Sequence, residues 1–162
     1  KPSSAASDVY KRQVGMFAIL LCIDMGIKQY IEDTFDRREE RKCIVPGIVL
    51  RKVYNRGFLL STLEKYPGIV QGASAVTGVV ILFYDFLLFL KKGKWLEKTG
   101  MIFLTAGAAS NIYDRLVRKK VIDYIGFQSK NKFLSSLTAN LADFYIVIGA
   151  VFVGIGRIGK RK

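Results

Sequence analysis

The sequence predicts an all-α integral membrane protein with four transmembrane helices and a small extracytoplasmic β element between the first two helices. Hydrophobic residues make up 51% of the 162 residues. They gather into four runs, each close to the about 20 residues that a spanning helix needs. The cations, which give a net charge of +13, gather in the tails and connectors beside these runs. The length suits one membrane-embedded domain over 1–162.

The four ranges expected to span the bilayer are 14–31, 68–90, 95–113 and 138–155. The second is the most uniformly apolar, whereas the third and fourth contain polar side chains. Residues 1–10 include a polar stretch without an initiator Met, so we expect a flexible tail or a vector-derived scar there. No small-residue cleavage site follows the first run, which favours a retained helix.

The connectors differ in length and character. Residues 91–94 (Lys-Lys-Gly-Lys) predict a tight basic turn, so the second and third helices are expected to be antiparallel neighbours. Residues 32–67 contain β-prone stretches at 43–50 and 52–55, which predict a small platform on the membrane surface. Residues 114–137 are expected to form a longer loop.

The distribution of cations indicates both orientation and partners. With four spans, the two termini and the 91–94 turn share one side, and the dense lysines there place that side in the cytoplasm. Cations beside apolar segments fit anionic lipid headgroups, whereas a nucleic-acid partner needs a basic face on a soluble fold. We therefore expect membrane lipids and no nucleic acid as partners.

The sequence contains no histidine, which excludes Ser-His-Asp and Cys-His catalysis and the usual histidine zinc sites. Cys22 lies in an apolar run and Cys43 in a polar connector. We expect two free thiols, no disulfide, no metal and no cofactor.

Two aspartates occur in near-matching contexts, Asn111-Ile-Tyr-Asp114 and Asn140-Leu-Ala-Asp143. A carboxylate at membrane depth is unfavourable and is read by default as functional. Asp114 ends the third helix and Asp143 begins the fourth, so antiparallel helices would bring the two together near the outer leaflet. In each helix the asparagine three residues earlier shares a face with its aspartate and can donate to it.

Two close carboxylates share one proton, because a neighbouring like charge raises one of the two pKa values. The charged member can take a proton from a water that attacks a peptide carbonyl, while the protonated member donates to the carbonyl oxygen. Asp114 and Asp143 therefore predict an aspartic protease that works in the membrane. The alternative is that each caps a helix or pairs with Arg115.

Asp24 and Lys28 form an i,i+4 pair on the first helix. Either the two charges neutralise each other so that both can be buried, or the pair faces the bundle and meets Arg115. A dyad of Ser110 with Lys28 is a further alternative, although the serine has no compelling context.

Three further segments have local interpretations. The small residues at 106–110 favour close helix packing and leave room for a substrate chain. Asp85 is expected to extend toward the basic turn at Lys91. The Tyr54-Asn-Arg-Gly-Phe58 segment reads as a turn that suits a polar contact to substrate backbone.

Five motifs occur in order along most of the chain: Asp24-Met-Gly-Ile-Lys28, Asn55-Arg-Gly57, Ala106-Gly-Ala-Ala-Ser110-Asn111-Ile-Tyr-Asp114-Arg115, Val121-Ile-Asp123-Tyr124 and Asn140-Leu-Ala142-Asp143. Together they resemble the bacterial lipoprotein signal peptidases, or type II signal peptidases. The family patterns that they look like are Asp-Gln-x-x-Lys, Asn-x-Gly-Ala, Gly-Gly-Ala-x-Gly-Asn-x-x-Asp-Arg, Val-Val-Asp-Phe and Asn-x-Ala-Asp.

The resemblance implies four transmembrane helices, a β platform and a catalytic aspartate pair, which carries over to Asp114 and Asp143. It also implies a lipidated prolipoprotein substrate, cut just before its diacylglyceryl-cysteine in the bacterial plasma membrane, and we expect a monomer. The residues expected to support catalysis or bind substrate are Asn111, Arg115, Asn140, Asn55, Asp24, Lys28, Gly57 and Phe58.

This chain departs from the family pattern at four places: Met25 for Gln, Ala106 and Ser110 for Gly, and Phe58-Leu59-Leu60 for an Ala-rich end. The last change makes the platform bulkier near the substrate, so we expect an altered substrate preference. The alternative function is a non-catalytic membrane protein of the same fold that binds lipidated peptides.

Overall fold

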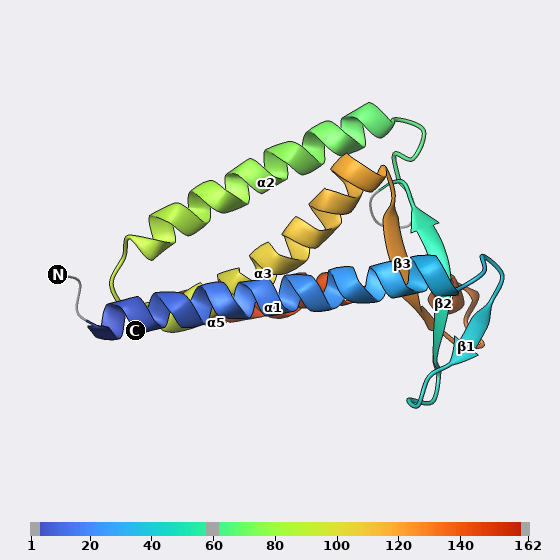
Figure 1. The fold of residues 1–162 in the computed structure, drawn as a ribbon, viewed down its shortest axis with the longest axis horizontal. Helices are drawn as coiled ribbons and strands as arrows, with labels where there is room; N and C mark the ends of the chain where they lie inside the picture. Colours follow the sequence, from blue (N-terminus) through green and yellow to red (C-terminus); the bar gives the residue numbers. More distant parts are fainter. Residues whose placement is uncertain (1–3, 58–61, 160–162) are drawn as a thin grey trace.

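The helices of this protein run side by side, and a four-stranded sheet stands across one end of them (Figure 1). The computed structural model describes residues 4–57 and 62–159. The beginning of α1 and the end of α5 both lie at the end remote from the sheet (Figure 1). The long helices are α1 (Ser4–Thr34), α2 (Pro67–Phe89), α3 (Trp95–Tyr113) and α5 (Leu141–Ile158).

Four long helices were expected, and all four are present. Three of them contain stretches long and apolar enough to cross a membrane, namely Tyr10–Thr34, Pro67–Phe89 and Leu141–Ile158. Helix α3 is not among these three. Three of its buried residues are polar, namely Glu97, Ser110 and Asn111.

Two helix boundaries differ from the prediction. Helix α1 begins at Ser4, so most of the segment expected as a flexible tail is helical, and the Tyr10 ring packs 6.0 Å from that of Phe89. Helix α5 begins at Leu141 and not at residue 138, because the Asn140 side chain caps it by accepting from the backbone N–H of Asp143.

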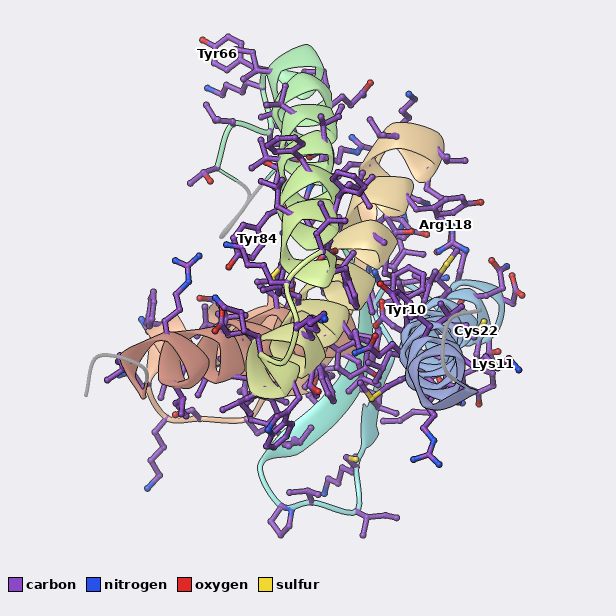
Figure 2. The ribbon with its side chains drawn as sticks, turned by 90° about the vertical axis from the view of Figure 1, so that its left-hand side faces the viewer. Tyr10, Lys11, Cys22, Tyr66, Tyr84 and Arg118 are labelled. Carbon is purple, nitrogen blue, oxygen red and sulfur yellow. The ribbon has the colours of Figure 1, made fainter. Side chains whose placement is uncertain are left out.

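Helix α3 occupies the centre of the bundle and contacts α1, α2 and α5 (Figure 2). Glycines allow α3 and α5 to approach closely. A Cβ added at Gly149 would lie 2.5 Å from the carbonyl oxygen of Gly100, and one added at Gly107 would meet the carbonyl oxygen of Ala142. The prediction that the 106–110 run favours close packing is therefore confirmed.

The sheet has the antiparallel strand order β1–β2–β3–β4. The strands are β1 (Glu40–Lys42), β2 (Ile48–Asn55), β3 (Val121–Phe127) and β4 (Thr138–Ala139). The β element between α1 and α2 was expected, but the loop expected at 114–137 is wrong. That segment contains a π-helix, η2 (Asp114–Arg118), then β3 and a short helix, α4 (Lys132–Ser136), and β4 follows directly after it.

The β3 segment is rich in β-branched and aromatic residues, which favours a strand once a partner is available. Its partner is β2, with Tyr54 opposite Ile122 and Val53 opposite Asp123. A cluster of buried apolar side chains fixes this sheet on the end of α1: Ile31 and Phe35 from the helix side pack with Ile122 and Tyr124.

The prediction that Asp85 on α2 extends toward the basic turn at Lys91 is wrong. The side-chain hydroxyl of Thr105 on α3 donates a 2.6 Å hydrogen bond to its carboxylate. Asp85 therefore joins α2 to α3 inside the bundle instead of extending to the basic turn. Both cysteines are free thiols, as expected.

Candidate active site

Buried polar side chains collect where the ends of α1, α3 and α5 meet the sheet. Buried polar groups are common in proteins only where they are hydrogen-bonded or paired, so such a collection requires an interlocked set of partners. The members are Asp24, Lys28, Ser110, Asn111, Asp114, Asp123 and Asn140, each exposed by 4% or less.

Lys28 lies at the centre of this collection. Its ammonium is 2.9 Å from carboxylate oxygens of both Asp24 and Asp114, and it donates 2.9 Å hydrogen bonds to Ser110 and Asn111. The sequence left open whether the Asp24–Lys28 pair faces the bundle. It does, but the charged residue that it meets is Asp114 of η2, not Arg115.

Asp24 ties four elements together. It accepts hydrogen bonds from the Ser110 hydroxyl (2.6 Å), the Tyr124 hydroxyl (2.9 Å) and the backbone N–H of Ala142 (3.2 Å). Burial raises the pKa of Tyr124 above its ordinary value, and the nearby charge of Asp24 raises it further, so this phenol stays a donor. Asp24 thus fixes α1 against α3, β3 and α5.

The contacts of Ser110 and Lys28 do not favour the alternative of a catalytic Ser110–Lys28 dyad. The two side chains are in contact, but the Ser110 hydroxyl donates its proton to Asp24 and not to the lysine. Lys28 in turn lies between two carboxylates. A nucleophilic serine needs a base that accepts its proton, and the contacts of Lys28 are those of a donor.

Asp114 is buried and faces a cation on each oxygen. Lys28 is 2.9 Å from Oδ2, and Arg118 donates a 3.0 Å hydrogen bond to Oδ1. Arg118 also donates to Gln29, so it joins η2 to α1. The sequence left open that Asp114 pairs with Arg115. Asp114 is indeed ion-paired, but its partners are Lys28 and Arg118.

Asp143 is half-buried near the beginning of α5. Its Oδ1 accepts a 2.9 Å hydrogen bond from the Asn111 amide, and its Oδ2 accepts from the backbone N–H of Asn140 at 3.1 Å. The sequence expected Asn111 to donate to Asp114 in its own helix. That expectation is wrong, because Asn111 reaches across to Asp143 and accepts from Lys28 instead.

The expected donation from Asn140 to Asp143 through its side-chain amide is also wrong. That amide donates a 2.8 Å hydrogen bond to Asp123 on β3. Asn55 on β2 donates to the other oxygen of Asp123 at 3.4 Å. Asp123 and Asp143 are thus held by one shared residue, Asn140.

Asp123 belongs to the Val121-Ile-Asp123-Tyr124 motif, but the sequence did not predict it to be a site residue. Burial raises its pKa from 3.8 to about 7, with a further contribution from the charge of Asp143. A carboxyl group with a raised pKa beside a second carboxylate is a physical mark of a functional site. The sequence signal was a single acidic residue inside an apolar, β-prone run at 121–127.

Arg115, Asn55 and Gly57 form the edge of the site. Arg115 donates to the carbonyl oxygen of Gly57 at 3.3 Å, and the Gly57 N–H donates to the Asn55 side chain at 3.0 Å. Burial lowers the pKa of Arg115, and the charges of Asp143, Asp123 and Asp114 oppose that change. Phe58, with Leu59 and Leu60, lies outside the described residues.

No group of three or more acidic or cysteine side chains in the described ranges is placed to hold a metal ion. The arrangement instead offers carboxylates in two different settings. Asp114 is neutralised by cations, whereas Asp123 and Asp143 have mainly amide and backbone donors. The second setting leaves a carboxyl group able to exchange a proton.

The sequence and fold match known proteins. The profile of the signal peptidase II (peptidase A8) family matches residues 16–158. A lipoprotein signal peptidase of Neisseria meningitidis serogroup C is 30% identical over 161 residues, covering 99% of this chain and 96% of the relative. One from Fusobacterium nucleatum is 32% identical, covering 88% of this chain and 84% of the relative.

Solved structures have the same fold. A bacterial membrane enzyme superposes with a TM-score of 0.79, covering 94% of this chain and 93% of the other, at 19% sequence identity. A second bacterial membrane enzyme structure gives a TM-score of 0.75 over 94% of this chain and 95% of the other.

Proposed function

Because this chain belongs to the signal peptidase II family, it is an aspartic peptidase that cleaves the signal peptides of prolipoproteins, and we propose that Asp123 and Asp143 perform the cleavage. The observation that carries this assignment is the bridge through Asn140. Its side-chain amide donates to Asp123, and its backbone N–H donates to Asp143. One residue therefore sets the mutual position of the two carboxyl groups.

The motif alone pairs Asp114 with Asp143, but the contacts favour Asp123 in place of Asp114. An aspartic peptidase needs one carboxyl group that carries a proton and one that accepts a proton. Asp114 serves as the partner of two cations, Lys28 and Arg118, so both of its oxygens are already engaged. Asp123 has a raised pKa of about 7 and can hold a proton near neutral pH. We assign Asp114 the role of positioning Lys28 and Arg118.

In the proposed reaction, charged Asp143 takes a proton from a water, and the resulting hydroxide attacks the scissile carbonyl carbon. Protonated Asp123 donates to the carbonyl oxygen as the tetrahedral intermediate forms. Collapse of the intermediate breaks the C–N bond, the leaving amine receives the proton that Asp143 took up, and one hydroxyl of the intermediate returns its proton to Asp123 as the new carboxyl group forms. Asn111 keeps Asp143 oriented throughout by its 2.9 Å hydrogen bond.

Substrate recognition is proposed for the edge formed by Asn55, Gly57 and Arg115. Gly57 precedes the segment at 58–61 in the sequence, and Arg115 already donates to the backbone carbonyl oxygen of Gly57. An arginine that donates to a backbone oxygen at the edge of the site is suited to hold an extended peptide there.

The proposal of a lipidated substrate rests on the family to which the chain belongs and on its apolar helices. We propose that the substrate is a lipidated prolipoprotein whose acyl chains remain in the bilayer. Each buried CH₂ contributes about 0.8 kcal/mol, so two chains anchor the peptide at a fixed depth. An unlipidated precursor lacks that positioning.

We further propose that α3 is a fourth transmembrane helix, since α1, α2 and α5 surround it and would carry it through the bilayer. The basic 91–94 turn and tail favour cytoplasmic termini, which place the site near the outer leaflet of a monomeric enzyme. In a Cys22→Ser, Cys43→Ser background, a membrane-impermeant thiol reagent should label Lys130→Cys on intact cells but not Lys92→Cys. The reverse pattern would invert the topology.

The purified protein, incubated with a lipidated prolipoprotein, should release the signal peptide, which a mass measurement detects. The matched control is a precursor whose lipidated cysteine is replaced by serine, which should be cut poorly or not at all. Binding of the lipidated precursor without a mass change would support the non-catalytic alternative. Equal cleavage of both precursors would indicate a general membrane protease.

A further inference from the structure

The turn between β1 and β2 displays apolar side chains that no part of the described chain covers. Ile44 is 100% exposed and Val45 is 52% exposed. The turn itself is held by the hydrogen bonds Cys43 N–H to Ile48, Ile48 N–H to Val45, and Gln128 N–H to Gly47. An isoleucine at the tip of a well-fastened turn would gain stability from an apolar environment.

A second exposed apolar pair lies on α4, beyond the same end of β3. Phe133 is 58% exposed and Leu134 is 44% exposed. Arg51 of β2 fixes the end of α4 by donating to the carbonyl oxygens of Ser135 and Leu137. We call Ile44, Val45, Phe133 and Leu134 the apolar edge. Exposed lysines flank it in the sequence at Lys42, Lys130 and Lys132.

The place of this edge in the fold indicates what covers it. The sheet lies at the ends of helices that are long and apolar enough to cross a membrane, and those ends lie at the bilayer surface. The β1–β2 turn projects sideways beyond the helices at about the level of those ends (Figure 1). Apolar side chains flanked by lysines at that level are typical of segments that insert into a leaflet.

We propose that the apolar edge inserts into the lipid leaflet on the side of the sheet and that the flanking lysines bind anionic phosphate headgroups. The charge favours this occupant, because lysines attract anionic lipid. The anchor has a consequence for the site. Strand β2 runs from the turn to Asn55, and its partner β3 carries Asp123, so the insertion would fix the sheet relative to the bilayer.

Fluorescence can test this insertion, because the protein has a single tryptophan, Trp95, at the end of α3 remote from the sheet. In a Trp95→Phe background, Ile44→Trp is compared with Arg38→Trp, an exposed position in the connector before β1. The proteins are reconstituted into phosphatidylcholine–phosphatidylglycerol vesicles whose acyl chains are brominated. Val45→Trp serves as a second probe if Ile44→Trp folds poorly.

Ile44→Trp should emit at shorter wavelength and be quenched severalfold more by brominated chains than Arg38→Trp, which aqueous acrylamide should quench instead. Acrylamide quenching of Ile44→Trp as strong as that of Arg38→Trp would overturn the insertion. In vesicles of phosphatidylcholine alone, or with Lys130→Gln and Lys132→Gln together, bromide quenching should fall. Unchanged quenching in both cases would overturn the headgroup contact. Neither measurement depends on proteolytic activity.

Discussion

Asn140 donates its side-chain amide to Asp123, 2.8 Å away and on a different element of the fold. The asparagine that precedes α5 therefore serves the sheet as well as the helix, since the same side chain also accepts from the backbone N–H of Asp143. The two carboxyl groups that we assign to catalysis, Asp123 and Asp143, are therefore connected through Asn140 and not through a pairing within one helix.

Asp123→Asn and Asp143→Asn should each lower the cleavage rate by about 10²–10⁴-fold or more, because each removes a group that exchanges a proton in the reaction. Asp114→Asn should retain measurable activity and lose mainly stability, since it leaves Lys28 and Arg118 with one fewer counter-charge. Cleavage of a lipidated precursor is measured beside the thermal unfolding midpoint of each variant. An active Asp123→Asn with a folded, inactive Asp114→Asn would restore the pairing that the motif alone suggests.

Asn111→Ala should lower the rate by roughly ten- to a hundredfold, because the loss of one hydrogen bond to a carboxylate is about 1–3 kcal/mol. Asn140→Ala should lower it more, because it removes the donor to Asp123 and the cap of α5 together. Asn131→Ala, which removes the cap of the short helix α4 away from the site, is the matched control. Equal rates for the three variants would exclude the proposed bridge.

The stability of the protein should fall as pH rises between about 4 and 7. The pKa of Asp123 is raised from 3.8 to about 7 in the folded state, chiefly by burial. The folded protein then binds this proton more tightly than the unfolded chain, so the stabilisation is complete below pH 3.8 and is lost as pH passes through about 7. The upper limit is about 4 kcal/mol, from 1.36 kcal/mol per pKa unit.

Thermal unfolding of the wild type and of Asp123→Asn, measured in detergent from pH 4 to pH 8, checks this expectation. The variant lacks the group, so its stability should depend less on pH over this window. Parallel curves would show that Asp123 does not titrate there. Cleavage by the wild type should also decline above about pH 7, where Asp123 loses the proton that it donates.

Gly149→Ala should lower the unfolding midpoint, whereas Gly154→Ala should leave it nearly unchanged. Both glycines lie on α5, but a Cβ at position 149 would fall 2.5 Å from the carbonyl oxygen of Gly100 and 2.6 Å from the backbone nitrogen of Leu104. No heavy atom lies within 4 Å of a Cβ at position 154. Overpacking typically costs about 1–3 kcal/mol. Equal midpoints for the two variants would mean that α3 and α5 can move apart freely.

The sequence predicted the helices well, because their signals are local. The range of α2 was expected within one residue at each end, and the Lys-Lys-Gly-Lys turn correctly separated it from α3. The sheet was only half predicted. Strand β3 pairs with β2 across more than 60 residues of chain, and nothing within residues 114–137 specifies that partner.

The sequence predicted most of the residues of the candidate site but not which of them are hydrogen-bonded or ion-paired to one another. Helical spacing placed Asn111 beside Asp114, yet tertiary partners prevail, since Lys28 from α1 meets Asp114 and Asn111 turns to Asp143. The spacing rule describes neighbours within one helix and contains no information on what other helices bring. Asp123 was overlooked as a site residue because its strand was expected to be a loop.

The pairing of β2 with β3 also sets an order of assembly. The two strands lie on the same side of the membrane but leave the ribosome separated by the whole of α2 and α3. Asp123 cannot meet Asn55 until both of those helices are in place, and it cannot meet Asn140 until the start of α5 has followed. With Asp123 and Asp143 as the proposed catalytic pair, a partly synthesised chain has no complete site, and we expect proteolysis only after α5 has been made and has packed against α3.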